Sequence, residues 1–287
     1  MTAAAAAAVP RRRRGPIDWG APATYFVALV CVALSATPVL FVILNGFRST
    51  AQMAYDPGGW PSPWILDNYI EVLQNEDFWI QLLNSAVAAL GTTLGVVVLG
   101  VMAAFVIARY AFRGRDFLFS LFTAGLLFPL SVAVVPLYVM LKGMGLYGNV
   151  TALILPQMAF ALPQTIIILV PFLRSIPAEL EDAATIDGAG RFGFFWRVVL
   201  PLSGPGLVTV GVLAFVASWN AYLLPLLLMG DPTHGTLPLG VQAFSTAYSQ
   251  DTAKVLAFTS IAMLPALLFF TIAQRRIVGG LTGAVKG

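Results

Sequence analysis

Ionisable side chains are scarce in this sequence. Only 10% of its 287 residues are Asp, Glu, Lys or Arg, whereas a soluble domain has roughly 25%. It contains one histidine and one cysteine, Cys31, so an intrachain disulfide is excluded and no metal site is expected. None of the three lysines precedes Ser or Thr, which excludes the phosphate-binding loop G-x-x-x-x-G-K-[ST]. We therefore do not expect this chain to hydrolyse a nucleotide by that mechanism.

Long apolar segments account for the missing charge. Apolar residues form 59% of the chain, and its mean hydropathy is +0.85. A helix needs about 20 apolar residues to cross a hydrocarbon core of about 30 Å. We therefore expect an all-α integral membrane protein with six transmembrane helices. The six uncharged windows are Thr24 to Phe47, Leu82 to Ala108, Phe117 to Leu141, Val150 to Leu173, Pro205 to Gly230 and Val255 to Gln274.

The basic residues predict the orientation of these helices. If the N-terminus is cytoplasmic, all Lys and Arg residues except Arg48, Lys142 and Lys254 lie on the cytoplasmic side, as the positive-inside rule requires. We expect both termini in the cytoplasm and a multi-pass membrane protein with no nucleic-acid partner. The expected regions are a basic tail (1–22), a six-helix domain (23–278) with an external loop (48–81) and a cytoplasmic loop (174–204), and a C-terminal tail (279–287).

The external loop combines acidic residues with tryptophans. Asp67 is a candidate N-cap of a short interfacial helix. The acidic residues of this loop, Glu76 and Asp77 among them, give the outer face a negative patch. Two interpretations remain open: this patch docks an external protein, or it is a solvated cap whose tryptophans lie at the lipid headgroups.

Polar residues within the apolar windows are candidates for a solute pathway. Gln157 and Gln164 are seven residues apart and so share one helix face, where they either line a pathway or bond neighbouring helices. A second group can handle a hydroxyl-rich solute, because rings stack on sugar faces and amides bond hydroxyls; the alternative is one satisfied Asn in a helix interface. This group consists of Ser218, Trp219, Asn220 and Tyr222.

Other features of the windows indicate packing and the source of energy. Gly91 and Gly95 have the spacing that lets two helices approach closely. No window has an Asp, Glu, Lys or Arg in its interior, whereas ion-coupled carriers commonly use such residues. Any transport is therefore expected to draw its energy from a partner.

A polar segment, Glu179 to Pro201, interrupts the apolar windows. Ser175 can cap a helix whose first turn holds Pro177 and acidic residues. Gly188 then predicts a turn, after which four apolar residues recur at near-helical spacing. They are Phe192, Phe195, Trp196 and Val199. We expect two short helices that form a rigid projection into the cytoplasm, rather than an amphipathic hairpin on the membrane surface.

The sequence "DAATIDGAGRFGFFWRVVLP", Asp182 to Pro201, resembles the EAA loop of permease subunits of bacterial ABC importers. That pattern is E-A-A-x-x-D-G-A, five residues, then F-x-x-I-x-L-P. The positions that match are Ala183, Ala184, Asp187, Gly188, Ala189, Phe195, Leu200 and Pro201. Asp182 replaces Glu and Val198 replaces Ile, so neighbouring Glu181 is a substitute for the longer acidic side chain. The stretches "KGMGLYGNVTALILPQ", "WNAYLLPLLL" and "RRIVGGLTGAVKG" are similar to the second permease of carbohydrate importers of the maltose type.

The resemblance implies a type I ABC importer permease fold in a bacterial cytoplasmic membrane and a transport subunit that is not an enzyme. It implies a second permease subunit, an ABC ATPase dimer and an extracytoplasmic solute-binding protein that delivers a sugar or oligosaccharide, and Glu76 and Asp77 are candidates for docking this protein. No cofactor is expected on this chain, since ATP and Mg bind to the partner ATPase. The implied ATPase-coupling residues are Glu181, Asp182, Ala183, Ala184, Asp187, Gly188 and Ala189.

Three alternatives remain. An importer of the same family can carry a polyamine, phosphate or peptide instead of a sugar. A secondary carrier is disfavoured by the absence of intramembrane charge, and a membrane scaffold is disfavoured by the match to the EAA loop.

Overall fold

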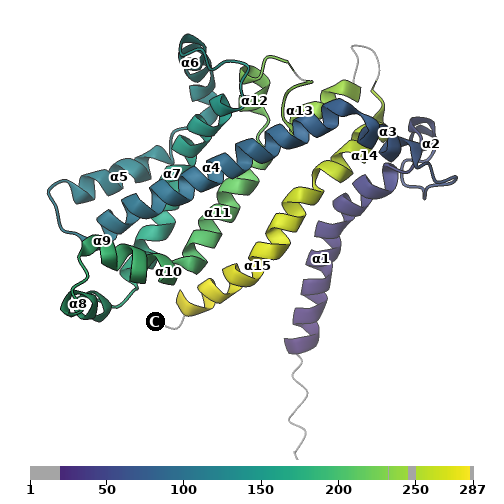
Figure 1. Ribbon diagram of the computed structural model, residues 1–287. Coiled ribbons are helices and arrows are strands. Elements are labelled where there is room, and N and C mark those ends of the chain that lie inside the picture. Colours follow the sequence, from purple (N-terminus) through teal and green to yellow (C-terminus); the bar gives the residue numbers. More distant parts are fainter. Residues whose placement is uncertain (1–19, 232, 245–249, 285–287) are drawn as a thin grey trace, which may run out of the picture.

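The computed structural model describes residues 20–231, 233–244 and 250–284, and this part of the chain is helical with no strand. Figure 1 shows the arrangement of the helices. The first half contains α1 (Gly20–Asn45), α2 (Thr50–Tyr55), α3 (Asp67–Gln74), α4 (Glu76–Arg109), α5 (Arg115–Gly125), α6 (Leu130–Gly143) and α7 (Thr151–Arg174). The second half contains α8 (Glu179–Ile186), α9 (Arg191–Phe194), a π-helical turn (Phe195–Val199), α10 (Leu200–Leu202), α11 (Gly204–Trp219), α12 (Leu223–Leu228), α13 (Leu237–Gly240), a 3-10 turn (Val241–Phe244), α14 (Thr252–Ala262) and α15 (Leu264–Ala284).

Within the described residues, four single helical stretches are long and apolar enough to cross a membrane. They are Pro22–Asn45, Glu76–Arg109, Thr151–Arg174 and Thr252–Gln274. Two bent pairs raise the number to six if each pair is one span: α5 with α6, and Arg191–Leu202 with α11. The chain is therefore an all-helical protein with four to six candidate membrane spans.

The sequence predicted one helix for each of the six apolar windows, but two of the windows are each divided into two helices. The window Phe117 to Leu141 divides into α5 and α6, which meet at an angle of 98°. Pro129 is the N-cap of α6, and a proline cannot donate the hydrogen bond that would continue α5. In the window Pro205 to Gly230, α11 ends at Trp219 and α12 starts at Leu223, because Pro225 prevents helical hydrogen bonding to the residues before it.

The centre of the bundle is the contact of α4 with α7 and α11. Gly91, Gly95 and Gly100 of α4 lie against α7, so closely that a Cβ atom at each would overlap an α7 side chain. The three side chains are Ile154, Met158 and Thr165 respectively. The close helix approach that we predicted for Gly91 and Gly95 is confirmed, and Gly100 extends it by one further turn.

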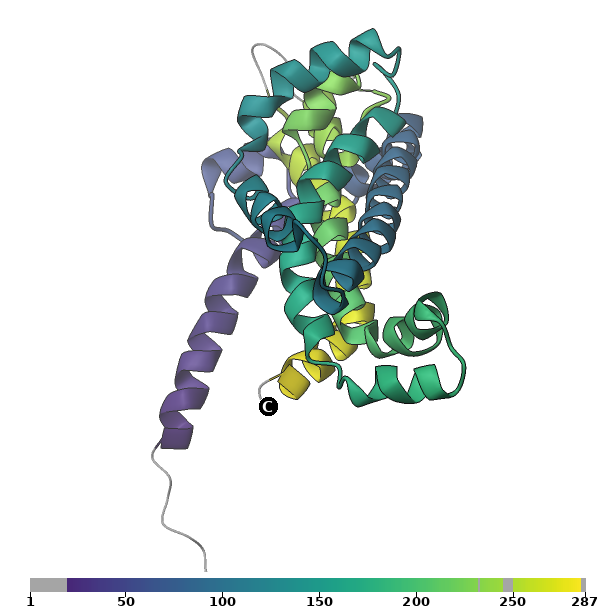
Figure 2. The same cartoon turned by 90° about the vertical axis from the view of Figure 1, so that its left-hand side faces the viewer.

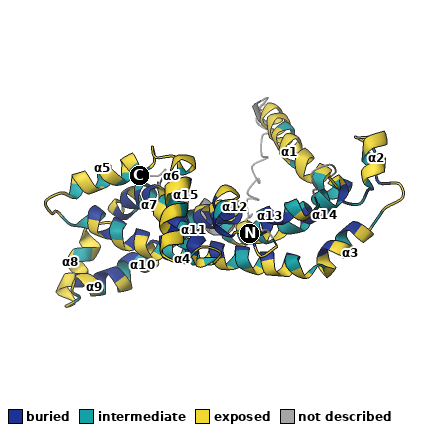
Figure 3. Cartoon of the chain, turned by 90° about the horizontal axis from the view of Figure 1, so that it is seen from above, coloured by how far each residue is buried: buried dark blue, intermediate teal, exposed yellow. Residues whose placement is uncertain are grey.

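Helix α1 stands apart from this centre, as Figures 1 and 2 show. Its neighbour in the bundle is α14, and its residues are exposed over most of its length, which Figure 3 shows in yellow. After α1, Arg48 is 2% exposed and donates hydrogen bonds from Nη1 to Asn45 Oδ1 (2.8 Å) and from Nη2 to the Gln52 carbonyl (3.0 Å). This arginine therefore fastens the start of the loop 48–81 to the end of α1.

The loop 48–81 contains α2 and α3 and is fastened to α14. Lys254 of α14 forms an ion pair with Glu71 of α3, and Thr50 donates a hydrogen bond to Asp251 Oδ1 (2.9 Å). The expectation that Asp67 caps α3 is wrong, because Leu66 holds the N-cap position and Asp67 is the first helical residue. There its carboxylate still complements the positive end of the helix dipole.

The two ends of the bundle are distinct (Figures 1 and 2). Helices α8, α9 and α10 lie at the same end as the start of α1 and the end of α15, and α2, α3 and α13 lie toward the opposite end. Helix α4 connects the two ends.

Candidate functional site

Helices α8 and α9 form a hairpin that is closed by a glycine turn. Gly188 has a φ of +78°, and the Ala189 amide donates to the Ala184 carbonyl (2.8 Å) while the Gly188 amide donates to the Thr185 carbonyl (3.0 Å). This pair of bonds is a Schellman motif, in which glycine is the residue that accepts the left-handed conformation without strain. The two helices and the glycine turn predicted for this segment are confirmed.

The start of the hairpin differs from the prediction. Helix α8 begins at Glu179 with Ala178 as its N-cap, so Ser175 and Pro177 precede it. Ser175 instead donates its hydroxyl to the Phe172 carbonyl (2.7 Å) at the end of α7. Three acidic residues do lie in the first turn of α8, where the helix dipole favours negative charge.

The hairpin has a buried and an exposed apolar face. Phe194, Phe195 and Val199 pack, together with Ala184, against the ends of α4 and α7. Ile186, Phe192 and Trp196 point away and are 86%, 74% and 52% exposed. The four residues expected on one apolar face are therefore divided between two faces, because the π-helical turn that follows α9 changes the residue spacing.

The residues matched to the EAA pattern are similarly divided. Asp182, Ala183, Asp187 and Gly188 are exposed, Glu181 and Ala189 are partly buried, and Ala184 is buried. The exposed surface of the hairpin thus combines two carboxylates with large apolar side chains.

Two arginine–ring contacts that the sequence did not reveal join this hairpin to α4. The Arg109 guanidinium lies 5.9 Å from the ring centroid of Phe194, and that of Arg191 lies 4.9 Å from the ring of Tyr110. Partial burial raises the pKa of the Tyr110 phenol, and the negative charge of Glu181 adds to this effect while both arginines oppose it. About 80 residues separate the partners in the sequence, so no local pattern identifies them.

A cavity of about 300 Å³ lies between α7, α11 and the start of α12. Gln157, Gln164, Ser218 and Tyr222 line it together with Thr92 of α4, and none of its lining residues is Asp, Glu, Lys or Arg. Gln157 Oε1 accepts hydrogen bonds from Thr92 Oγ1 (3.1 Å) and Ser218 Oγ. Its Nε2 is buried and has no hydrogen-bond partner.

Trp219 and Asn220, which the sequence placed with the same group, lie elsewhere. They line an apolar groove of about 530 Å³ between α11, α14 and α15. Trp219 Nε1 donates to the Ala262 carbonyl (3.1 Å), and Asn220 Nδ2 donates to the Val216 carbonyl (2.9 Å). Four of the six predicted pathway residues therefore share one cavity, and these two do not.

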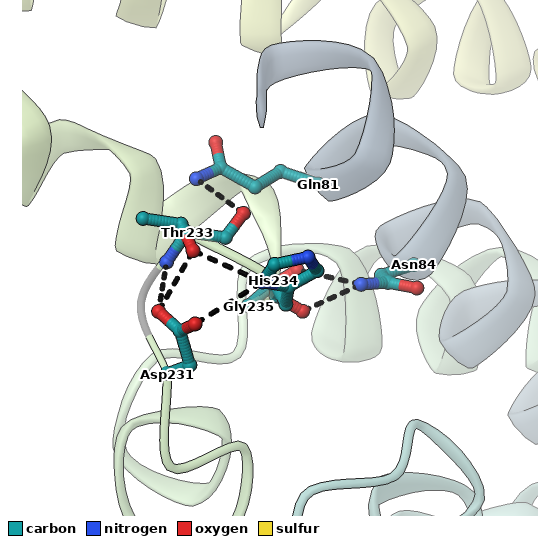
Figure 4. A network of polar contacts seen from close by, with 6 residues as sticks. All are labelled: Gln81, Asn84, Asp231, Thr233, His234 and Gly235. Carbon is teal, nitrogen blue, oxygen red and sulfur yellow. Dashed lines mark hydrogen bonds and ion pairs between the residues drawn. The ribbon is translucent and has the colours of Figure 1, made fainter. Parts of the chain in front are cut away.

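The opposite end of α4 holds the other candidate surface. Glu76 and Asp77 form its first turn, which the Asn75 side chain caps. In the next turns, Asn84 Nδ2 donates to the carbonyls of His234 (2.6 Å) and Gly235 (3.1 Å), as Figure 4 shows. The start of α4 and the loop after α12 therefore form one connected surface, in which His234 pairs with the Asp231 carboxylate (3.1 Å).

Comparison with known proteins identifies the family of this arrangement. Residues 96–282 match the family described as "Binding-protein-dependent transport system inner membrane component". The chain is 37% identical to the trehalose transport system permease SugB of Mycobacterium tuberculosis, over 92% of this chain and 98% of that protein. It is 35% identical to the diacetylchitobiose uptake system permease NgcG of Streptomyces coelicolor, over 85% and 82%. A crystal structure of a bacterial ABC transporter that imports the acidic polysaccharide alginate contains a chain with the same fold, with a TM-score of 0.73, 19% identity and coverage of 93% and 99%.

Proposed function

Because this chain belongs to the inner-membrane components of binding-protein-dependent transport systems, we propose that it is the membrane-spanning subunit of an ATP-driven importer of a sugar or oligosaccharide. The main support is the hairpin α8–α9 with the π-helical turn that follows it, where Ile186, Phe192 and Trp196 are exposed, as are the carboxylates of Asp182 and Asp187. Clustered large apolar and aromatic side chains at a polar surface are typical of the centre of a protein interface.

The partner on this hairpin is an ABC ATPase dimer, which holds ATP and Mg and hydrolyses ATP. The chain itself has no G-x-x-x-x-G-K-[ST] loop, so the free energy of hydrolysis has to reach it through a contact. The acidic first turn of α8 complements basic groups on such a partner. A second permease subunit completes the membrane part of the importer.

In this proposal the bundle crosses the bacterial cell membrane six times, with each bent pair as one span and both termini in the cytoplasm. The end that holds the hairpin contains Arg109 and Arg191, and the start of α1 and the end of α15 lie toward the same end. This asymmetry agrees with the excess of basic residues that cytoplasmic segments carry.

A sugar is the proposed solute because relatives along most of the chain are named for sugar uptake and because the cavity is neutral. Its polar groups are the amides of Gln157 and Gln164 and the hydroxyls of Thr92, Ser218 and Tyr222. These groups can exchange hydrogen bonds with hydroxyls. A polyamine importer is the less favoured alternative, since no carboxylate lines the described cavity to pair with an ammonium group.

The external partner is a solute-binding protein, which docks on the surface formed by the first turn of α4 and the loop after α12. Glu76 and Asp77 provide negative charge there, and such charge steers and orients a basic partner surface.

The test is capture of the ATPase by the purified chain. The double variant Phe192→Glu/Trp196→Glu is expected to lose the co-purifying ATPase in mild detergent, because two charges replace the exposed apolar face. The control is Tyr55→Glu, at a residue that is 93% exposed at the opposite end of the bundle, and it is expected to retain the ATPase. Mass spectrometry of the bound proteins identifies the partners. The solute class is identified by adding the binding protein with each of a panel of sugars and polyamines and measuring which solute stimulates ATP hydrolysis. Equal capture by wild type and the double variant would contradict the proposal.

A further inference from the structure

Two arginines join the hairpin to α4 in a reciprocal arrangement. Arg109, the last residue of α4, lies over the ring of Phe194 in α9, whereas Arg191 of α9 lies over the ring of Tyr110, the C-cap of α4. Each of the two elements therefore contributes one cation and one ring. At 5.9 and 4.9 Å from the ring centroids, both guanidinium groups are within the distance at which the ring quadrupole attracts a cation.

We propose that these four residues, which we call the arginine brace, hold the hairpin and α4 together as one rigid body, so that a displacement of the hairpin moves α4. The brace is a positioning device and does not touch the solute. The proposal rests on the proposed function, in which the ATPase displaces the hairpin.

Further contacts extend the brace to a third segment. Arg109 Nη2 donates to the Ile176 carbonyl (2.6 Å) in the linker between α7 and α8. The Phe105 ring of α4 packs against Tyr110 at 5.4 Å and against Phe195 at 4.9 Å between ring centroids. The last turn of α4 is thus in contact with the segments that precede and follow the two hairpin helices.

The local position of Arg191 indicates that it is kept for its contact with α4. Arg191 is the first residue of α9, where the positive end of the helix disfavours a cation. Arg109 Nε and the Tyr110 hydroxyl are buried without a hydrogen-bond partner, which is normally unfavourable. Local helix energetics therefore do not explain Arg191, and its contact with Tyr110 of α4 does. Arg109 is at a favourable position in the last turn of α4.

Helix α4 leads from the brace to the other candidate surfaces. Thr92, in its middle, bonds Gln157 at the cavity, and Glu76 and Asp77 form its outer first turn. Its 34 residues contain no proline, and kinks in helices occur mostly at prolines. Displacement of the hairpin is therefore transmitted along α4 to the cavity wall and to the outer surface.

The test measures whether the hairpin moves relative to α4. Cys31 is the sole cysteine, so a Cys31→Ser chain can carry two spin labels on exposed residues outside the proposed ATPase-binding surface. These are Thr185→Cys in the hairpin and Met102→Cys in α4. Double electron–electron resonance gives the distribution of distances between the two labels in the complete complex with its ATPase, before and after trapping with ATP, Mg and vanadate. In the wild-type background we expect a narrow distribution that trapping leaves unchanged.

Removing the brace is expected to let the hairpin move without α4. With Tyr110→Leu the distribution should broaden and shift on trapping, and Arg191→Gln, at an exposed residue, provides a second variant with little risk to folding. Tyr110→Phe keeps the ring and serves as the matched control with wild-type behaviour. A wild-type distance that shifts on trapping, or narrow unchanged distributions in both brace variants, would overturn the brace while leaving the importer function intact. A wild-type chain that captures no ATPase would instead overturn the proposed function and the brace with it.

Discussion

The contact of α4 with α7 allows a quantitative prediction for Gly100→Ala. The new Cβ would overlap Thr165 Cγ2, well inside the ~3.5–4.0 Å at which carbon atoms attract each other. Thr165 cannot easily move, because a β-branched side chain in a helix is stiff, its hydroxyl donates to the Ala161 carbonyl (2.9 Å) and the residue is 3% exposed. Overpacking typically costs about 1–3 kcal/mol, and alanine regains about 1 kcal/mol of helix propensity.

We therefore expect Gly100→Ala to destabilise the fold by up to about 2 kcal/mol, which corresponds to a Tm lower by up to about 8 °C. Thermal unfolding in a fixed detergent, monitored by the monomer peak in size-exclusion chromatography, measures this change. Gly95→Ala should cost less, since it meets the flexible end of Met158. Gly143→Ala should not destabilise, because no atom lies within 4 Å of its Cβ.

A second substitution identifies the overlapping group. Thr165→Ser removes the methyl group that the new Cβ meets and keeps the hydroxyl, so the double variant Gly100→Ala/Thr165→Ser should recover most of the lost stability. A double-mutant cycle gives the coupling between the two positions. Purely additive effects, or a Gly100→Ala chain at least as stable as wild type, would refute the packing argument.

Four further predictions concern polar groups. Arg48→Met should lower Tm by several degrees, because the variant removes the donors to the carbonyls of the loop 48–81, and an unchanged Tm would contradict the role of this arginine. Gln157→Leu should raise Tm, since an unpartnered buried donor costs about 1–3 kcal/mol and the freed threonine and serine hydroxyls can turn to carbonyls of their own helices; a lower Tm would refute this. Lysine substitution of both Glu76 and Asp77 should reduce the association rate of the binding protein in surface-binding measurements, most strongly at low salt, and equal rates would exclude this docking surface. The hydrogen bond from the Thr233 hydroxyl is the main cause that lowers the pKa of Asp231 from 3.8, so the contribution of this carboxylate is complete above pH 3.8 and is lost as the pH falls through the lowered pKa. The protection of the loop amides against hydrogen exchange, relative to their intrinsic rates at each pH, should therefore fall in acid in wild type but not in Asp231→Asn.

Composition and local pattern were sufficient to predict the helical class, the apolar segments and the hairpin. The apolar windows depend on runs of side chains, and the turn at Gly188 depends on one residue that tolerates a positive φ. The search for charge-free windows did not separate α5 from α6 or α11 from α12, because Pro129 and Pro225 occur among apolar residues. A proline within a window can lie inside one helix, as three prolines do in α7, or stand at a break between two helices, as Pro129 does. The outcome depends on neighbouring helices that the sequence does not locate.

The residues that line the candidate cavity were predictable only in part, because the packing of the helices decides which side chains reach it. Gln157 and Gln164 share a face by simple periodicity, and the structure places both on the cavity. Ser218 and Trp219 are adjacent in sequence, yet their side chains leave α11 in different directions and reach different surfaces. The arginine brace was not predicted because each contact joins residues that are distant in the chain.

The length of α4 has a consequence for where the proposed ATPase partner binds. At 1.5 Å per residue its 34 residues extend for about 51 Å, whereas a hydrocarbon core is about 30 Å thick. Even with a tilt of about 20°, roughly 18 Å of helix lies outside the apolar layer, shared between its two ends. The hairpin at the end of α4 can therefore stand at the depth of the headgroups or beyond, where the proposed water-soluble ATPase could reach it without entering the bilayer.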